Sequence, residues 1–324
     1  MKKIYKLISI LILVTLLNSC TDSSTDGEPK IDKEIYKGRV GVELDFFDNK
    51  LPDEVFEGEE MNYIIKIENK GVYKVQNSKM VISLEKGFIQ TSSTDKCTAQ
   101  DNIAICNNLV LEGKDFFKDF DDFDIIEIPL KINDLDELRE SHESYIYTNF
   151  CYDYMGLAFT EICIDTDPHS ITVTEKPCEG DKVISMSGGQ GGPVVIDRIE
   201  PRMFIENDKL KPQFKIFLQN SGSGTVIKKG SVATVCGSSQ LNSDTYNSVK
   251  LSALEFSNYK LNDFTCIPDE LSLRNEEDFI VCTLNNGIDR KSTPTYVTPL
   301  KIQIDYGYTQ SDSKQIKIKK ISPY

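Results

Sequence analysis

Four segments of the sequence alternate apolar and polar residues with a period of two. They lie at residues 61–67, 214–219, 302–305 and 316–319. Successive side chains of a β-strand point to opposite faces, so this pattern is typical of strands that are buried on one side. No segment keeps the three-to-four residue spacing of an amphipathic helix, and the best candidate, residues 134–143, is short and polar. The sequence therefore predicts an all-β fold of antiparallel strands.

Two landmarks occur twice along the chain, in the same order. Residues 65–71 and 216–222 are apolar-rich runs that each end in Asn-x-Gly, and these residue types tolerate the left-handed backbone of a tight turn. Residues 128–132 and 298–302 share a proline near the start of an apolar run, where a strand tolerates the missing N–H. The repeated order predicts two copies of one sandwich domain.

A glycine-rich stretch separates the two copies. Residues 185–193 read Ser-Met-Ser-Gly-Gly-Gln-Gly-Gly-Pro, a composition that predicts a hinge or linker. We expect a first β-sandwich domain over residues 38–174, a linker over 175–193 and a second β-sandwich domain over 194–324. A chain of 324 residues is long enough for two such domains.

The N-terminus carries an export signal. Residues 1–6 are positively charged, and residues 7–17 form an apolar run that is too short to span a bilayer but typical of a signal peptide. Leu17-Asn18-Ser19-Cys20 resembles a lipobox, with an aliphatic residue three positions before the cysteine. The resemblance implies that residues 1–19 are removed and that Cys20 carries a lipid. An ordinary signal peptide with an incidental cysteine, or an uncleaved anchor, is the alternative.

The residues after Cys20 support the lipobox interpretation. Residues 21–30 are polar and nearly devoid of apolar side chains, so they predict a flexible spacer, and we assign residues 20–37 to the lipidated cysteine and this spacer. A lipoprotein modification carries at least two lipid chains, which suffices for stable attachment. We therefore expect an extracytoplasmic protein held at the cell membrane or cell surface, with the membrane as a partner.

The charge of the chain limits its other partners. The formal net charge is −14, and removal of Lys2, Lys3 and Lys6 with the signal peptide takes it to −17. A strongly acidic chain is repelled by nucleic acid and by anionic lipid, so neither is expected as a partner.

Eight cysteines remain when Cys20 is assigned to the lipid, four on each side of residue 170. An even number of cysteines in an exported chain predicts disulfides. Turn signals between nearby cysteines favour the pairs Cys97 with Cys106, Cys151 with Cys163 and Cys266 with Cys282, which leaves Cys178 with Cys236. A zinc site is the competing interpretation, but no Cys-x-x-Cys occurs, and His142 and His169 are not spaced from any cysteine as ligands usually are.

The sequence offers few groups for catalysis. His142 and His169 are the only side chains that titrate near neutral pH, and no Gly-x-Ser-x-Gly, His-Glu-x-x-His or P-loop is present. We therefore predict that the protein is not an enzyme and holds no cofactor or metal, although a hydrolase that uses paired carboxylates remains an alternative.

Two aromatic-rich stretches are candidates for binding. In residues 115–124, aspartate alternates with phenylalanine; the carboxylates could hold Ca²⁺, or the phenyl rings could pack the loop while the carboxylates stay solvated. The second stretch contains Tyr145, Tyr147, Phe150, Tyr152 and Tyr154. Because Tyr147 and Tyr152 differ in parity, at least one tyrosine pair should face inward unless a bulge intervenes. An exposed pair could bind a sugar or a partner chain.

One family resemblance appears. Gly41-Val42-Glu43-Leu44, the acidic Gly-containing turn at residues 54–59 and the strand end Glu68-Asn69-Lys70-Gly71 resemble archaeal and bacterial surface lipoproteins with paired Ig-like domains, of the adhesion and surface-layer-associated kind. The resemblance implies two tandem Ig-like β-sandwich domains and a surface location, and it brings no catalytic residues.

These observations lead to one functional hypothesis and one alternative. We expect a lipid-anchored extracytoplasmic protein that serves in binding, adhesion or envelope architecture, with a surface protein or a glycan as its ligand. The alternative is a carbohydrate-binding or enzyme-accessory module at the cell surface.

Overall fold

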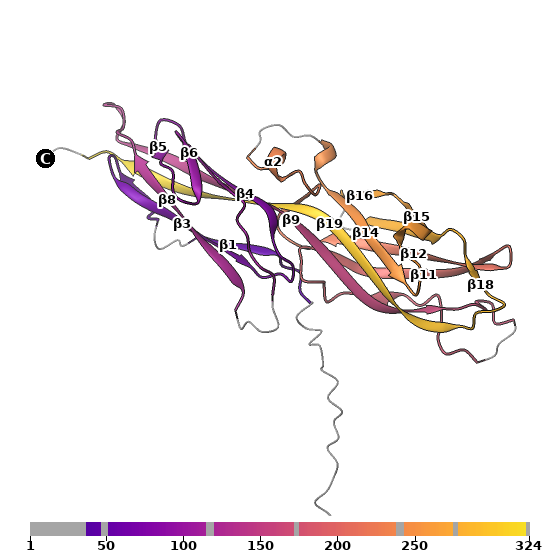
Figure 1. Ribbon diagram of the computed structural model, residues 1–324. Coiled ribbons are helices and arrows are strands. Elements are labelled where there is room, and N and C mark those ends of the chain that lie inside the picture. The colour runs from indigo at the N-terminus through magenta and orange to yellow at the C-terminus, as the bar shows by residue number, and fades with distance from the viewer. Residues whose placement is uncertain are drawn as a thin grey trace, which may run out of the picture. The chain divides into compact units, whose positions relative to one another are not determined.

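The computed structural model describes residues 37–46, 51–114, 120–171, 175–237, 243–274 and 278–321. These residues form almost only β-strands, with one four-residue α-helix, α2 (Val232–Val235), among them (Figure 1). The all-β prediction is confirmed. Residues 34–324 form one compact unit, and no helix within the described ranges is long and apolar enough to cross a bilayer. The signal peptide, Cys20 and almost all of the spacer, predicted over residues 1–37, lie outside the described residues.

A nine-stranded sheet runs through both halves of the chain. Its two central strands, β9 (Ser141–Ile164) and β19 (Tyr296–Lys319), are antiparallel and paired along 24 residues each. The order is β16-β14-β19-β9-β4-β7-β6, with β16 at Glu270–Ser272, β14 at Ser248–Phe256, β4 at Gln76–Leu84, β7 at Ile103–Asn107 and β6 at Cys97–Gln100. Two short strands also pair with β19, namely β2 (Glu54–Phe56) and β13 (Thr225–Ile227).

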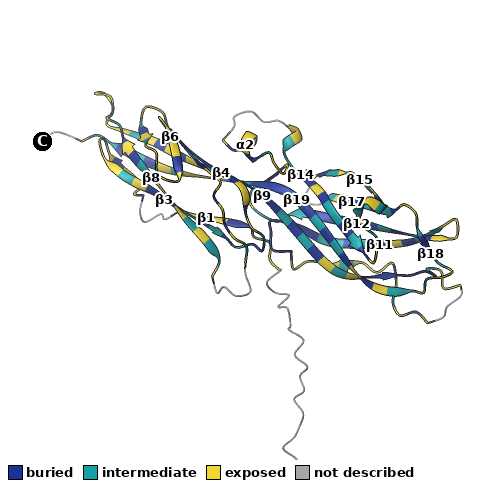
Figure 2. Cartoon of the chain, in the orientation of Figure 1, coloured by how far each residue is buried: buried dark blue, intermediate teal, exposed yellow. Residues whose placement is uncertain are grey.

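Two smaller sheets supply the rest of the strands. The first has the order β1-β3-β8-β5, with β1 at Val42–Phe46, β3 at Glu60–Asn69, β8 at Asp122–Ile132 and β5 at Ile89–Thr91. The second has the order β10-β11-β12-β17-β15, with β10 at Ile184–Ser185, β11 at Val194–Glu206, β12 at Lys209–Asn220, β17 at Asp278–Leu284 and β15 at Phe264–Ile267, and β18 (Ile288–Asp289) beside β12. Buried residues of all three sheets meet in one apolar core. Burial alternates along most strands (Figure 2), as the period-two pattern predicts.

The two halves repeat the same turn in detail. β3 ends at Asn69 and β12 ends at Asn220. Each asparagine donates its side-chain N–H to the carbonyl four residues later, at 2.7 and 2.9 Å, and accepts the N–H of the glycine two residues later, at 3.1 and 3.2 Å. The orders β1-β3-β8 and β11-β12-β17 correspond as well. A duplicated sandwich predicts this correspondence, and the Asn-x-Gly landmarks mark it in the sequence.

The glycine-rich connection is hydrogen-bonded to the first residues that the structure describes. The Gly38 N–H donates to the Gly188 carbonyl at 2.9 Å, and the Gly191 N–H donates to the Gly38 carbonyl at 2.8 Å. Gly191 has φ +71°, and a Cβ there would lie 2.0 Å from the Val72 side chain, so this position requires glycine. The ranges 38–174 and 194–324 each contribute one long strand to the shared sheet, and their independence as two domains stays a prediction.

All eight cysteines outside the N-terminal segment form disulfides. Two predicted pairs are confirmed: Cys97–Cys106 joins β6 to β7, and Cys266–Cys282 joins β15 to β17. The other two bonds are Cys151–Cys236 and Cys163–Cys178. Four disulfides are typical of a protein that folds outside the cytosol, in an oxidising compartment.

The predicted pairs Cys151–Cys163 and Cys178–Cys236 were wrong. Met155-Gly156 is not a turn, because both residues lie inside β9 and pair with Asp305 and Ile304 of β19. Cys151 and Cys163 are therefore separated by twelve residues of one extended strand, or about 40 Å at about 3.3 Å per residue. A disulfide requires Cα atoms within about 7 Å.

Candidate binding surfaces

His142 occupies a closed polar cluster at one end of β9. Its Nε2 lies 2.9 Å from Glu85 Oε2, its Nδ1 lies 2.8 Å from Arg139 Nη1, and its ring stacks on Phe88 at 3.6 Å. Because arginine can only donate, Nδ1 accepts and Nε2 carries the proton. Burial acts to raise the pKa of Glu85, but the hydrogen bond from His142 and the nearby charge of Arg139 act against it, and the pKa is lowered. Both ring nitrogens are thus already engaged.

The two histidines do not share a site. His169 is exposed in the loop that follows β9, and His142 lies near the opposite end of that strand. A strand of 24 residues is about 75 Å long when extended. The two candidate acid–base groups therefore cannot act on one substrate.

The acidic stretch 115–124 is described only from Phe120 onward. Asp122 accepts the Glu112 N–H at 2.7 Å, and Asp124 forms an ion pair with Lys96. Phe120 is 68% exposed and Phe123 is also exposed, so in the described part the phenyl rings do not pack the loop as that interpretation supposed. Within the described ranges, no three His, Cys, Asp or Glu side chains are grouped as metal ligands. Calcium binding at residues 115–124 stays a hypothesis.

A shallow hollow of about 500 Å³ lies on the outer face of the four-stranded sheet. Its lining includes Glu60, Asn62, Gln90, Thr91, Pro129 and Lys131. Glu60 and Lys131 form an exposed ion pair at 3.6 Å within this lining.

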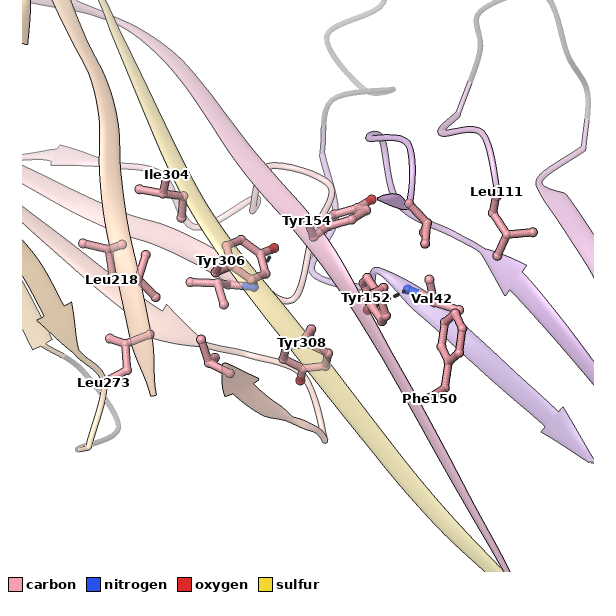
Figure 3. Close-up of a cluster of buried hydrophobic side chains, with 14 of the residues drawn as sticks. Val42, Leu111, Phe150, Tyr152, Tyr154, Leu218, Leu273, Ile304, Tyr306 and Tyr308 are labelled. Atoms are coloured by element: carbon pink, nitrogen blue, oxygen red, sulfur yellow. Dashed lines mark hydrogen bonds between the residues drawn. The ribbon is translucent and has the colours of Figure 1, made fainter. Parts of the chain in front are cut away.

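Four buried tyrosines form the junction between the halves (Figure 3). On β9 and β19, Tyr152 pairs with Tyr308 and Tyr154 pairs with Tyr306, so the pattern is symmetric about the pair Asp153–Gly307. Each hydroxyl accepts one backbone N–H. On β9, Tyr152 accepts from Val42 at 3.2 Å and Tyr154 accepts from Tyr73 at 3.1 Å. On β19, Tyr306 accepts from Val194 at 3.4 Å and Tyr308 accepts from Gly224 at 2.8 Å. We call these four residues the tyrosine tetrad.

The tyrosine tetrad is a structural element and not a proton-transfer site. Burial raises the pKa of all four phenols, that of Tyr308 to about 12. The hydroxyls are therefore neutral at physiological pH, where they hold the backbone of both halves against β9 and β19. The repeated contacts explain why the two halves meet at this point.

Tyr145 and Tyr147 lie on the opposite face of β9 from the tetrad. They are 39% and 54% exposed, and their rings stack with centroids 6.0 Å apart and planes 21° apart. The parity argument is confirmed, because one group of aromatic residues faces inward and the other outward without a bulge between them. Among the described residues, neither hydroxyl has a hydrogen-bond partner.

Polar side chains flank this exposed pair. Gln315 and Ser313 of β19 lie opposite Tyr145 and Tyr147, and Ser83 of β4 lies opposite Tyr147 on the other side. The helix α2 covers the nearby centre of the same sheet face. There α2 packs Val232 and Val235 over the sheet, and the Cys151–Cys236 disulfide holds it in place. The outer sheet face thus leaves two stacked aromatic rings uncovered among amide and hydroxyl groups.

Comparisons with known proteins give only distant likenesses. No family model and no curated protein matches the sequence. Among solved structures, a DUF4466 family protein from Parabacteroides merdae is 12% identical, with a TM-score of 0.19, covering 82% of this chain and 99% of that one. The CupB6 tip adhesin from Pseudomonas aeruginosa is 8% identical, with a TM-score of 0.18, covering 88% and 98%.

A secreted serine protease, VesC from Vibrio cholerae, is 8% identical, with a TM-score of 0.22, covering 91% of this chain and 54% of that one. At such identities and TM-scores these likenesses carry no argument about activity. The family resemblance drawn from the residues therefore stays an expectation.

Sequence reasoning missed a second aromatic surface, on the outer face of the six-stranded sheet. The Arg198 guanidinium lies 3.5 Å from the centre of the Phe217 ring, and the Lys215 ammonium lies 4.0 and 4.5 Å from the rings of Phe279 and Phe217. The one available signal was Phe217, an apolar residue at a position where the alternation of β12 calls for a polar one. We call these four residues the cationic aromatic face.

Proposed function

We propose that this protein is a lipid-anchored extracytoplasmic binding protein without catalytic activity, and that Tyr145 and Tyr147 contact its ligand. The observation that carries the proposal is the exposure of this stacked pair beside the amide and hydroxyl groups of Gln315, Ser313 and Ser83. Tyrosine supplies a large contact area with little loss of side-chain entropy, and it is enriched in protein interfaces.

The first described residues are bonded to the centre of the molecule. Lys37–Gly41 lies against the glycine-rich connection, where Arg39 donates to the Ser187 carbonyl at 2.8 Å, and the Val42 N–H that follows donates to Tyr152 of the tetrad.

Cys20→Ala is expected to abolish lipid labelling and to release the protein from membranes. The thiol is the proposed acceptor of the lipid, and the hydrophobic chains supply the attachment. In phase separation with a cloud-point detergent, the wild-type chain should enter the detergent phase and the variant the aqueous phase.

The control for this experiment is Cys97→Ala/Cys106→Ala, which changes two cysteines and keeps Cys20. It should remain labelled and in the detergent phase. Labelled Cys20→Ala, or wild-type Cys20 found in a disulfide, would show that the anchor is assigned wrongly.

Tyr145→Ser/Tyr147→Ser is expected to weaken binding of the mature lipoprotein to isolated cell envelopes of its source by about tenfold or more. Truncation of an aromatic contact residue typically costs 1 to 2 kcal/mol or more. Quantitative envelope pull-down from neutral detergent measures the loss.

Phe159→Ser is the matched control, because Phe159 is 61% exposed on the same face of the same strand. Equal binding by the double variant and by wild type would remove the tyrosine pair from the ligand site.

A glycan is the second candidate ligand. Gln315, Ser313 and Ser83 place amide and hydroxyl groups beside the rings, and sugars combine ring stacking with hydrogen bonds. Capture that survives protease treatment of the envelopes but not glycosidase treatment would favour the carbohydrate-binding alternative over a surface protein.

A further inference from the structure

The outer face of the six-stranded sheet carries two cations without an ion pair among the described residues, Lys215 of the cationic aromatic face and Arg202 beside it. Arg198 is paired with Glu200 through Nε at 3.1 Å, and Lys211 is paired with Glu206. In contrast, Lys215 contacts only the two phenyl rings, and Arg202 has no ion pair among the described residues. Neither Lys215 nor Arg202 forms an ion pair within the described residues, although Glu200, which is bonded to Arg198, lies directly opposite Lys215 in the register of β11 and β12.

The strand register brings these two cations together. In the register of β11 and β12, Lys215 lies opposite Glu200 and Gln213 lies opposite Arg202. Lys215 and Arg202 are therefore diagonal neighbours on adjacent strands. Diagonal neighbours on one face are about 7 to 8 Å apart at Cα, which long side chains easily span. One anionic group can therefore reach both.

Apolar surface continues directly beside the cations. Phe279 is 43% exposed, and Ile267, which pairs with Val281 on the next strand, is also exposed. Across the sheet, the order is cations on β11 and β12, a partly exposed ring on β17 and an exposed isoleucine on β15. A ligand that fits this order has an anionic group next to an apolar ring face.

The cations also repeat along the strands. Arg198 and Arg202 of β11, and Lys211 and Lys215 of β12, are each four residues apart, or about 13 Å along an extended strand. Because the whole chain has a net charge of −14, a local surplus of cations on one sheet face is a specific feature and not the average surface. Because Arg198 and Lys211 are already paired with Glu200 and Glu206, Lys215 and Arg202 are the two cations of this repeat that are left for an anionic ligand.

We infer that the outer face of the six-stranded sheet binds an acidic polysaccharide, with Lys215 and Arg202 receiving a carboxylate while a sugar ring stacks on Phe279. An acidic peptide fits less well, because extended peptides gain affinity by pairing with a sheet edge and this surface is a sheet face. An anionic bilayer fits less well, because the net charge of the rest of the chain opposes its approach.

The test uses the mature lipoprotein in neutral detergent and three polymers of matched length. These are alginate as a polyuronate, dextran as a neutral polysaccharide and poly-glutamate as an acidic peptide. Calorimetric titration should show alginate binding at low salt that weakens as NaCl is raised, because exposed charges are screened. Dextran and poly-glutamate should bind at least tenfold more weakly.

Three variants locate the site. Lys215→Ala should weaken alginate binding about tenfold, as expected for loss of one charge-assisted contact, and Lys215→Arg should restore it. Lys250→Ala removes an equal charge from an exposed position on β14 of the other sheet and should leave binding unchanged.

Absence of alginate binding at low salt would overturn the inference, as would equal loss in Lys215→Ala and Lys250→Ala. Preferential binding of poly-glutamate would replace the polysaccharide by an acidic protein segment. Because the envelope assay with Tyr145 and Tyr147 concerns the other sheet, its failure would leave this result interpretable.

Discussion

Tyr154→Ala is expected to lower the free energy of unfolding by about 4 kcal/mol, the magnitude typical of truncating a fully buried aromatic side chain. The Tyr154 ring packs against the rings of Tyr73, Tyr152 and Tyr306, with centroids 5.7 to 6.1 Å away. Alanine would leave a cavity at the junction of the halves and an unpaired Tyr73 N–H. Denaturant unfolding with the disulfides intact measures the change.

Tyr154→Phe separates the hydroxyl from the ring. The ring stays, but the partly buried Tyr73 N–H loses its acceptor, which costs about 1 kcal/mol. Tyr308→Phe removes the equivalent acceptor of the Gly224 N–H and should cost a similar amount. A large effect in one half and none in the other would contradict the equivalence of the two halves.

Tyr147→Ala is the control for both variants, because it truncates an exposed tyrosine on the same strand. Surface substitutions of this kind usually change the free energy of unfolding by no more than about 0.5 kcal/mol. If Tyr154→Ala were as mild as this control, the tyrosine tetrad would not hold the halves together.

Local signals in the sequence carried the prediction of the fold. The period-two runs predicted strands because burial on one side imposes that period on any half-buried strand. The Asn-x-Gly pairs predicted a duplication because the side chains of Asn69 and Asn220 must close the same turn in each half. Cys97–Cys106 and Cys266–Cys282 were predictable because each pair lies on neighbouring strands close in sequence.

Those local signals could not predict which distant segments of the chain pair with each other. Gly156 looks like a turn residue in the sequence, but it lies in a continuous strand where a Cβ would come within 3.0 Å of the Ile304 side chain. The Cys151–Cys236 bond depends on the position of α2 over the outer sheet face, and no local sequence pattern predicts that position. Similarly, Phe217 and Phe279 meet only because β12 pairs with β17.

The same distinction applies to the candidate surfaces. The parity of their positions predicted that the tyrosines of β9 divide between the two sheet faces. The structure then showed which face is buried, and so which pair is exposed. The cationic aromatic face combines side chains from three strands, so its residues carry no shared sequence motif. Surfaces built on one strand are predictable from the sequence, and surfaces built across a sheet require the register.

Cys151→Ala/Cys236→Ala is expected to lower the free energy of unfolding by about 4.5 kcal/mol. This bond closes a loop of 85 residues, and the chain-entropy account assigns about that value to a loop of this size. Removing both cysteines avoids a free thiol that could exchange with the other disulfides. The helix α2 should also lose its fixed place over Val81, which exposes the apolar side chains that α2 covers.

Cys163→Ala/Cys178→Ala is the matched comparison, because it removes a bond that closes only 15 residues. The same account gives about 3 kcal/mol for it, so the two variants should differ by about 1.5 kcal/mol. Denaturant unfolding of both variants under non-reducing conditions measures that difference. If both variants lost the same free energy of unfolding, the effect of each bond would come from native packing around it. The restraint on the unfolded chain would then not determine the loss. The long bond joins a strand of the first half to the residue that follows α2 in the second half, so the long loop that it closes spans the junction between the halves.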